Sequence, residues 1–299
     1  MGHIITDLKE AFRRGNVYIQ LIFINVGVFV ITTLIGILLQ LFNRSAARIC
    51  ELLALPASFT RFAWQPWSIF TYMFMHAGFL HILFNMLWLY WFGALFLYFF
   101  SGKHLRGLYI VGGICGGLLY MISYNVFPYF RPMTAYSTMV GASASVLAIV
   151  VATAYREPNY PVRLLFFGNV RLKYLALIVV LTDLLFITSS NAGGHIAHLG
   201  GALAGLWFAA SLNKGKDITS WVNKALDAIA ALFSAKTWKR KPKMKVHYGN
   251  NTRQNDYDYN ARKKAQSDEI DRILDKLKKS GYESLTTEEK KNLFDASKR

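Results

Sequence analysis

Charged residues are scarce in this sequence, and their scarcity argues against an ordinary soluble fold. They make up 17% of the 299 residues, whereas soluble proteins carry about a quarter. Apolar residues reach 54% and are gathered in long runs rather than spread evenly. Long runs with few charges are typical of helices that cross a membrane. The composition therefore predicts an all-α membrane protein with several spans.

Cysteine is also scarce, with only Cys50 and Cys115 in the chain. Two cysteines provide neither a disulfide framework nor a set of metal ligands. Residues 1–16 lack the short apolar core and the small-residue cleavage site of a signal peptide. We therefore expect no metal and no cofactor, and we expect the first apolar run to stay in the membrane.

Acidic residues are outnumbered by basic ones, 17 against 34, which leaves a formal net charge of +17. The excess lies mostly in loops and in the C-terminal third, and no motif that reads RNA or DNA is present. The charge is therefore interpreted as serving membrane topology and binding of anionic lipid. No nucleic-acid partner is expected.

Six apolar runs divide the first two-thirds of the chain. The predicted spans are residues 17–42, 81–100, 108–124, 143–155, 175–189 and 195–212. Residues 1–16 are predicted to form a cytoplasmic amphipathic segment, and the aromatic-rich connection 43–77 to lie half-sunk among lipid headgroups. The basic residues of alternate loops place both termini in the cytoplasm by the positive-inside rule.

After residue 212 the chain becomes polar and basic. Residues 213–265 are predicted to hold an interfacial helix and a polybasic linker that binds anionic lipid, with a flexible polar stretch at 250–260. Residues 266–299 are predicted to form a small helical hairpin in the cytoplasm. Its second helix begins with Thr286 and Glu289 at the spacing of a capping box.

Two polar residues are predicted near the outer ends of apolar helices. Ser143 lies about 12 residues before the inner end of the fourth span, or roughly 18 Å of helix rise. His198 lies about 14 residues before the inner end of the sixth, or roughly 21 Å. If both helices end at one inner boundary, the two side chains lie at nearly equal depth, as a nucleophile and its general base require.

Two further polar residues share one face of the second span. His81 and Asn85 are four residues apart at its outer end, so they project in the same direction. Both side chains carry hydrogen-bond donors, and together with the backbone N–H of Ser143 they could stabilise an oxyanion. An interhelical hydrogen bond is the simpler interpretation of this pair.

The small residues beside these positions also have a packing interpretation. Gly141 and Ser145 fit a seam at which helices approach closely, and the same holds for Gly201 and Gly205. In the second case the seam would press the sixth span against the fourth.

A metal site or a proton relay is the alternative for His198, because His195 lies three residues away on the same face. Against a metal, no intramembrane Cys or Glu completes a ligand set. Asp183 is the only carboxylate deep in any span, and its predicted place near the middle of the fifth span is too deep to make a third catalytic group. It is assigned a structural hydrogen-bonding role.

Three motifs together resemble the signature of the rhomboid family of intramembrane serine proteases. They are His76-x4-His81-Ile-Leu-Phe-Asn85-Met-Leu-Trp88, Gly141-Ala-Ser143, and Ala197-His198-Leu-Gly200-Gly201-x3-Gly205. The resemblance covers about residues 17–212 and implies a six-transmembrane-helix bundle. It also implies a Ser–His dyad with no acidic third member, in which Ser143 is the nucleophile and His198 the general base. His81, Asn85 and the Ser143 N–H would form the oxyanion site.

The resemblance further implies cleavage of single-span membrane proteins near the outer ends of their helices. This chain departs from the family pattern after the nucleophile, where Ala144 replaces a glycine and Leu147 replaces a tyrosine that stacks on the base. The common Trp-Arg pair of the first loop is Trp67-Ser68 here. A methyl group at position 144 is expected to crowd the oxyanion site, but no catalytic group is missing.

These observations predict an intramembrane serine endopeptidase of the plasma (inner) membrane, with its active site open to the extracytoplasmic side. A catalytically inactive rhomboid-like protein that binds membrane clients is one alternative. A small transporter is the other, although the inner halves of the second and sixth spans, at residues 89–96 and 206–210, are apolar.

Overall fold

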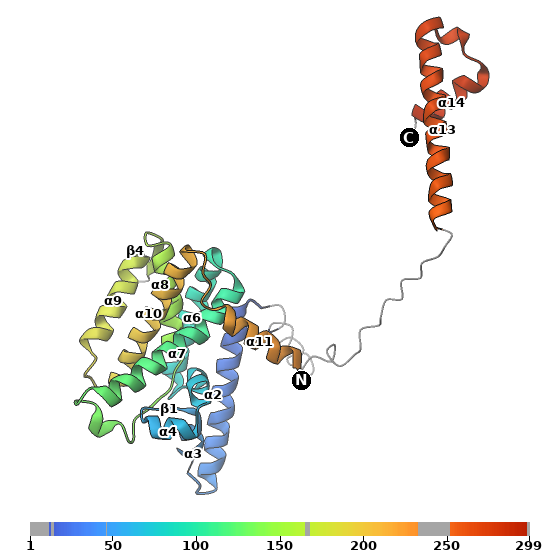
Figure 1. Cartoon of the computed structure of the whole chain (residues 1–299). Helices are drawn as coiled ribbons and strands as arrows, with labels where there is room; N and C mark the ends of the chain where they lie inside the picture. Colours follow the sequence, from blue (N-terminus) through green and yellow to red (C-terminus); the bar gives the residue numbers. More distant parts are fainter. Residues whose placement is uncertain (1–11, 13–14, 46, 165–167, 233–251, 298–299) are drawn as a thin grey trace. The chain divides into compact units, whose positions relative to one another are not determined.

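The computed structural model describes residues 12, 15–45, 47–164, 168–232 and 252–297 (Figure 1). The chain divides into two compact units, Met1–Thr237 and Trp238–Arg299. The amphipathic segment predicted at 1–16 lies almost entirely outside the described residues. The basic cluster of the predicted linker, at 236–245, also lies outside them.

The first unit is a bundle of apolar helices. Four of its described helices are long and apolar enough to cross a membrane, namely α2 (Val17–Leu41), α6 (Phe79–Phe99), α7 (Gly102–Val126) and α10 (Ala192–Asn213). Two shorter helices stand in the places of the predicted fourth and fifth spans, α8 (Ser143–Arg156) and α9 (Leu172–Leu185). The helix α11 (Ser220–Leu232) follows α10. This is the architecture of an all-α protein with several membrane spans.

The boundaries of helices α7 and α9 differ most from the predicted spans. The predicted start of the third span at residue 108 is wrong, because α7 already begins at Gly102, where the Ser101 side chain caps it by accepting from the His104 N–H at 3.2 Å. The fifth helix ends at Leu185 rather than near residue 189, although Phe186 and Ile187 prolong the apolar run. This early end moves Asp183 close to the end of its helix.

Helix α8 is enclosed by its neighbours, and residues 144–154 are all buried. Glycines on α7 and α10 let the backbones approach it. A Cβ atom added at Gly201 would meet the carbonyl oxygen of Ala144, and one added at Gly205 would meet that of Ala148. The start of α8 is therefore held by contacts that leave no room for a side chain on α10.

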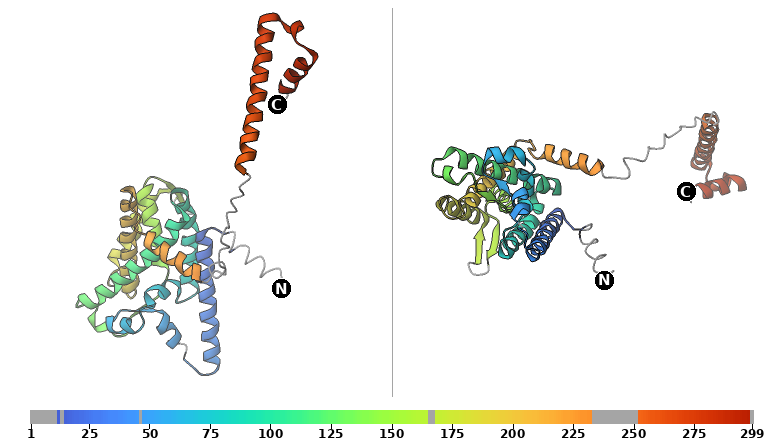
Figure 2. Two further views of the ribbon diagram at one scale, coloured as in Figure 1. Left: turned by 45° about the vertical axis from the view of Figure 1, so that its right-hand side comes forward. Right: turned by 90° about the horizontal axis from the view of Figure 1, so that it is seen from below.

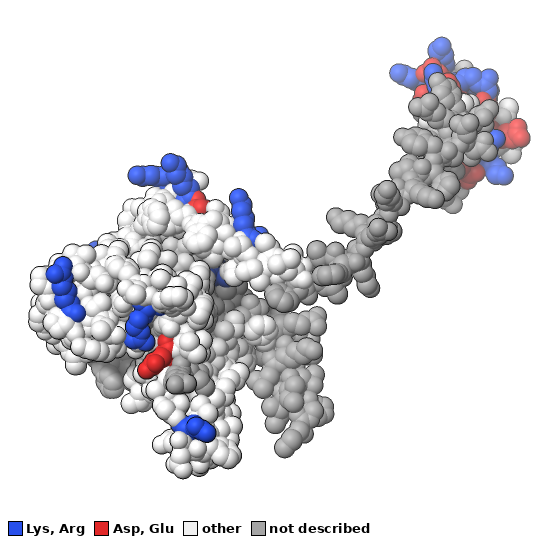
Figure 3. Space-filling view, turned by 60° about the horizontal axis from the view of Figure 1, so that its bottom comes forward, with Lys and Arg blue, Asp and Glu red and all other residues white. Residues whose placement is uncertain are grey.

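Helix α2 runs along the edge of the bundle (Figures 1 and 2) and buries only Leu21 and Asn25 among its residues. The Asn25 amide donates to the hydroxyl of Tyr109 on α7 at 3.0 Å, which ties α2 to the bundle. On the face of the first unit in Figure 3, charged side chains are few and isolated among uncharged ones. Such a surface suits contact with lipid.

The connection between α2 and α6 folds into short elements at one end of the bundle (Figure 1). These are α3 (Ala47–Leu53), β1 (Leu55–Pro56), α4 (Phe59–Trp64), α5 (Ser68–Thr71) and η1 (Tyr72–Phe74). Tyr72 and Met73 are fully buried, whereas Trp64 is 82% exposed, so the connection is amphipathic as predicted. Strand β1 pairs antiparallel with β2 (Thr138–Met139), which ties the connection to the segment before α8.

Neither these strands nor a hairpin between α8 and α9 was predicted from the sequence. Strand β3 (Pro161–Leu164) pairs with β4 (Gly168–Arg171) in the loop between α8 and α9. The turn η2 (Arg131–Met133) lies in the loop between α7 and β2. Both sheets are short, and the fold remains mainly helical.

The second unit is a helical hairpin made of α13 (Thr252–Ser280), η3 (Tyr282–Ser284) and α14 (Thr287–Ser297). The predicted capping box is confirmed, because the Thr286 N–H donates to Glu289 at 2.8 Å and the Glu289 N–H donates to the Thr286 hydroxyl at 3.3 Å. A hydrogen bond from Lys276 is the main cause that lowers the pKa of Glu289 to about 2. Among the hairpin residues whose burial is described, Ile273 and Leu285 are the buried apolar ones.

The predicted flexible stretch at 250–260 is wrong from Thr252 onward. Helix α13 begins there rather than at residue 266. The sequence from 252 to 280 contains no glycine or proline, so nothing in it breaks a helix. Polarity alone was a poor guide to flexibility in this segment.

Candidate active site

The loop before α8 is shaped around a glycine. Gly141 has a φ of +136°, a backbone conformation that favours glycine, and its N–H donates to the carbonyl of Tyr72 at 2.9 Å. A Cβ atom here would lie 2.9 Å from Nε2 of His81 and 3.6 Å from Oγ of Ser143. Gly141 thus leaves space at a point that the His81 ring and the Ser143 hydroxyl both approach.

Ser143 is the first residue of α8, so its N–H belongs to the unpaired first turn of the helix. Among the described residues this N–H donates to no acceptor. The positive end of the helix dipole favours negative charge at the same place. The backbone of Ser143 therefore offers a hydrogen-bond donor beside its own hydroxyl.

The hydrogen bonds of His81 determine which ring nitrogen can donate. Its Nδ1 accepts from the Ala77 N–H at 3.3 Å, so the neutral ring carries its proton on Nε2, the atom that faces Gly141. Asn85, one turn further along α6, donates one amide hydrogen to the His81 carbonyl at 2.9 Å and keeps the other. Each residue has one N–H available for a ligand.

His76, in the connection before α6, packs the edge of its ring against His81 with centroids 5.1 Å apart. Burial, and then the neighbouring His81, lower the pKa of His76 to about 4. Its ring is therefore neutral at physiological pH and supports the orientation of His81 without adding a charge.

Two cavities meet at the predicted site residues. One, of about 210 Å³, is lined mainly by apolar side chains of α6, α8 and α9, including Phe84, Trp88 and Val179. The other, of about 530 Å³, lies under the loops and includes His81 in its lining. Asn85, Ser143 and His198 line both cavities. The four predicted polar residues are thus gathered where an apolar space joins a polar one.

The depth predicted for Asp183 is wrong. Its carboxylate is buried, yet Oδ1 lies 2.9 Å from Nδ1 of His198 and 2.8 Å from Nδ1 of His195. The reason is the early end of α9 at Leu185, which leaves Asp183 two residues from the helix terminus and level with the start of α10. Asp183 makes hydrogen bonds as predicted, but its partners are the candidate general base and the neighbouring histidine.

The observed position of Asp183 also brings three candidate metal ligands together. The ligand atoms of Asp183, His195 and His198 all lie within 4.8 Å of one another, so three candidate ligands do meet. A zinc ion would need the coordinating nitrogen of each histidine to be free of its proton. It would also need a fourth ligand to complete tetrahedral coordination. Two N–H···O hydrogen bonds to one carboxylate oxygen account for the same distances.

The two departures after Ser143 have local explanations. Ala144 is buried, and a Cβ atom at Gly116 of α7 would lie 2.6 Å from its methyl group. The methyl group therefore occupies space that Gly116 leaves, and Ala144 lines neither cavity, contrary to the expected crowding. Leu147 lines the apolar cavity together with Trp88.

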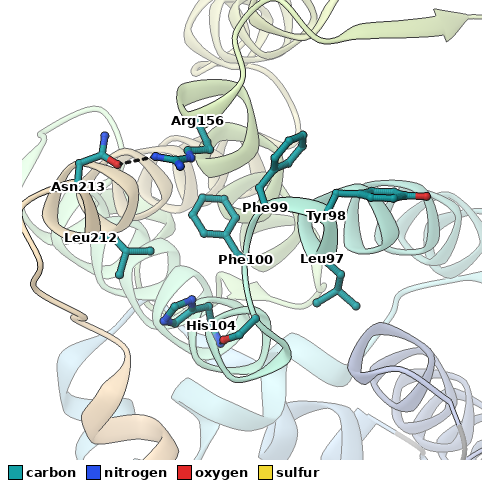
Figure 4. A pocket seen from close by; sticks show the side chains of 9 residues that line it. Leu97, Tyr98, Phe99, Phe100, His104, Arg156, Leu212 and Asn213 are labelled. Carbon is teal, nitrogen blue, oxygen red and sulfur yellow. Dashed lines mark hydrogen bonds between the residues drawn. The ribbon is translucent and has the colours of Figure 1, made fainter.

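A third cavity, of about 760 Å³, lies at the opposite ends of α6, α8 and α10. Figure 4 shows Phe99 and Phe100, at the end of α6, beside Arg156, which donates to Asn213 at 3.3 Å. None of the predicted site residues lines it. Its place at the other end of α8 separates it from Ser143.

Comparison with known proteins gives three matches. A family model described as Rhomboid domain matches residues 63–214, and a family of unknown function, DUF6576, matches residues 254–299. RHOMBOID-like protein 12, mitochondrial, of Arabidopsis thaliana is 29% identical over 158 residues, which is 50% of this chain and 47% of that protein. The chain thus spans about half the length of this curated relative. The C-terminal match coincides with the helical hairpin.

Proposed function

This chain belongs to the rhomboid family, and on that premise we propose that it is an intramembrane serine endopeptidase. Its substrates would be membrane proteins with a single span, cut within or next to that span. One observation carries the proposal, namely that Asn85, Ser143 and His198 line both cavities and that His81 lines the polar one. Nucleophile, base and oxyanion donors are then available to one reacting carbonyl.

The reaction is acyl transfer. His198 takes the hydroxyl proton as Ser143 Oγ attacks the carbonyl carbon of the scissile peptide bond. The oxyanion that forms accepts hydrogen bonds from the Ser143 N–H and from the free N–H groups of His81 and Asn85. His198 then gives the proton to the leaving amine. Water attacks the acyl-enzyme by the same route and releases the acid.

We expect substrate and water to enter different cavities. The apolar cavity, with Phe84, Trp88 and Val179, suits a segment of an apolar helix that has lost its regular structure. The polar cavity reaches Ser143 from beneath the loops and suits the water that hydrolyses the acyl-enzyme. The scissile bond would lie where they meet.

We assign the chain six spans, with the short helices α8 and α9 as the fourth and fifth. Both termini lie in the cytoplasm by the distribution of basic loops, and the site opens to the extracytoplasmic side of a plasma (inner) membrane. The polybasic linker would bind anionic lipid at the inner surface. No nucleic acid, metal or cofactor takes part in this scheme.

Reconstitution with substrate tests the proposal. Purified protein in lipid vesicles should cleave some single-span proteins at a bond near the outer end of the span, and His198→Ala should not. Binding of these proteins without cleavage by either form would instead indicate an inactive client-binding protein. Movement of a solute across the vesicle membrane without cleavage would indicate a transporter.

Asn85→Ala is expected to lower kcat by about 10- to 1,000-fold, because it removes one oxyanion donor. The matched control is Asn25→Ala, since Asn25 is also a buried helix asparagine whose amide donates to the carbonyl four residues back. It lies on α2 and lines neither cavity. Turnover and melting temperature should be measured for both. Wild-type kcat in the folded Asn85 variant would remove this side chain from the mechanism.

A further inference from the structure

We propose that Asp183 is a positioning residue that orients the imidazole of His198 and fixes its tautomer, so that the site works as a Ser143–His198–Asp183 triad rather than as a serine–histidine pair. The inference rests on the proposed function, because it assigns Asp183 a part in the same reaction. It contradicts the dyad that the family resemblance implies. The observation behind it is the hydrogen bond of 2.9 Å between Asp183 Oδ1 and His198 Nδ1.

The surroundings of Asp183 make this contact specific. Its side chain is only 5% exposed, and the described charged or titratable groups that touch it are the two rings of α10. Oδ1 accepts from both His195 and His198, while Oδ2 is buried without a partner among the described residues. A buried carboxylate is retained only where hydrogen bonds compensate for lost water. Here these bonds come from the candidate general base and its neighbour.

The contact determines the tautomer of His198. An ionised carboxylate only accepts hydrogen bonds, so the ring nitrogen that faces it must carry the proton. A neutral imidazole has a single N–H, and placing it on Nδ1 leaves Nε2 of His198 as an acceptor. Nε2 is the atom a general base needs free for the hydroxyl of Ser143. Without Asp183 the proton can sit on either nitrogen, and the ring loses its anchor.

The hydrogen bond between Asp183 and His198 would also stabilise the charge that forms on His198 during the reaction. When His198 takes the serine proton it becomes a cation, and the carboxylate at 2.9 Å stabilises that cation in a largely buried place. The proton remains on the imidazole, and Asp183 stays ionised. His195 supplies a second N–H to the carboxylate but lines neither cavity. Its loss leaves the bond between Asp183 and His198 in place.

Kinetics of the full-length protein separate positioning from packing. Asp183→Leu removes the acceptor and the charge at similar volume, and it should lower kcat by about 100- to 10,000-fold while KM changes less than about threefold. Asp183→Asn keeps the shape of the side chain, but its amide N–H group can donate to Nδ1 of His198 and hold the ring proton on Nε2, so its kcat should fall by a similar factor. The matched control is His195→Ala, which breaks the other hydrogen bond to the same oxygen and should cost less than about fivefold.

The outcomes that overturn the proposal are distinct. The proposal is wrong if kcat of the folded Asp183→Leu protein stays within threefold of the wild-type value. It is also wrong if His195→Ala lowers kcat as much as Asp183→Leu does. A rise in KM at unchanged kcat would place Asp183 in substrate binding instead. If a chelator changes the wild-type rate and the change disappears in His195→Ala, the three side chains form a metal site and the positioning role is wrong.

Nitrogen NMR of histidine-labelled protein gives a readout that does not depend on cleavage. Neutral His198 should carry its proton on Nδ1 in the wild type, and a mixture of tautomers should appear in Asp183→Leu. A wild-type ring protonated on Nε2 would overturn the proposal. If no substrate is cleaved but the Nδ1 tautomer is found, the proposed function fails while the positioning by Asp183 stands.

Discussion

Replacing Ser143 by alanine is expected to reduce cleavage of single-span substrates by at least about 10⁴-fold, to the level of vesicles without protein. In the proposed mechanism this hydroxyl forms the acyl-enzyme, and no other described serine or threonine hydroxyl combines the same helix start with a place between two cavities. Cleavage should be followed by the appearance of both product fragments. The fold should remain, because the lost oxygen faces open space.

The matched control for this variant is Ser145→Ala. Ser145 lies two residues further along α8 and is fully buried, and its hydroxyl has no partner among the described residues. Its replacement should leave the rate within about threefold of wild type, because a neutral hydroxyl without a partner contributes little. Equal loss in the two variants, or cleavage by Ser143→Ala, would exclude Ser143 as the nucleophile.

Gly201→Leu is expected to have the largest effect on stability, lowering the free energy of unfolding by about 3 kcal/mol or more. A Cβ atom at this position overlaps the carbonyl oxygen of Ala144, which is backbone and cannot turn aside as a side chain would. Helices α8 and α10 must separate to admit it. Because α8 carries Ser143 and α10 carries His198, activity should fall together with stability.

Gly27→Leu is the control for this change. Gly27 lies within α2, and a Cβ atom added there has no neighbour within 4 Å among the described residues. Leucine is a better helix former than glycine and suits a lipid-facing position, so stability should be unchanged or slightly higher. The free energy of unfolding of both glycine variants can be measured in mixed micelles with increasing dodecyl sulfate. Equal stability of the two variants would contradict the close packing of α8 on α10.

The sequence could indicate which four polar residues lie at the two cavities, because the signals for them are local. His81 and Asn85 share a helix face by their spacing, and the depth of Ser143 and His198 follows from counting residues to the inner ends of their helices. The capping box at Thr286 is equally local, since its two members lie three residues apart. These signals need only residue spacing within a helix, whereas the comparison of the two depths also assumes that both helices end at one inner boundary.

The position of Asp183 could not be predicted in the same way. The apolar run continues through Phe186 and Ile187, so hydrophobicity does not show that α9 ends at Leu185. Counting inward from residue 189 therefore placed the carboxylate too deep. A signal was present, because a lone acidic residue in an apolar run needs a partner and His195 and His198 lie on one face of the next helix.

The segment that holds Gly141 was also beyond sequence reasoning. Strand β1 is two residues long and pairs with β2, more than 80 residues further along the chain. Neither strand shows a period that could be recognised. Their pairing, and the hydrogen bond from Gly141 to Tyr72, depend on the packed bundle.

The most direct test of the central claim is to locate a covalent adduct. The full-length protein in detergent is treated with a serine-directed phosphonate, digested, and analysed by mass spectrometry. The adduct is predicted on Ser143, absent from Ser145, and lost in His198→Ala, because the reagent requires a hydroxyl activated by that base. No adduct on the folded wild-type protein, or one at any other serine, would contradict the account.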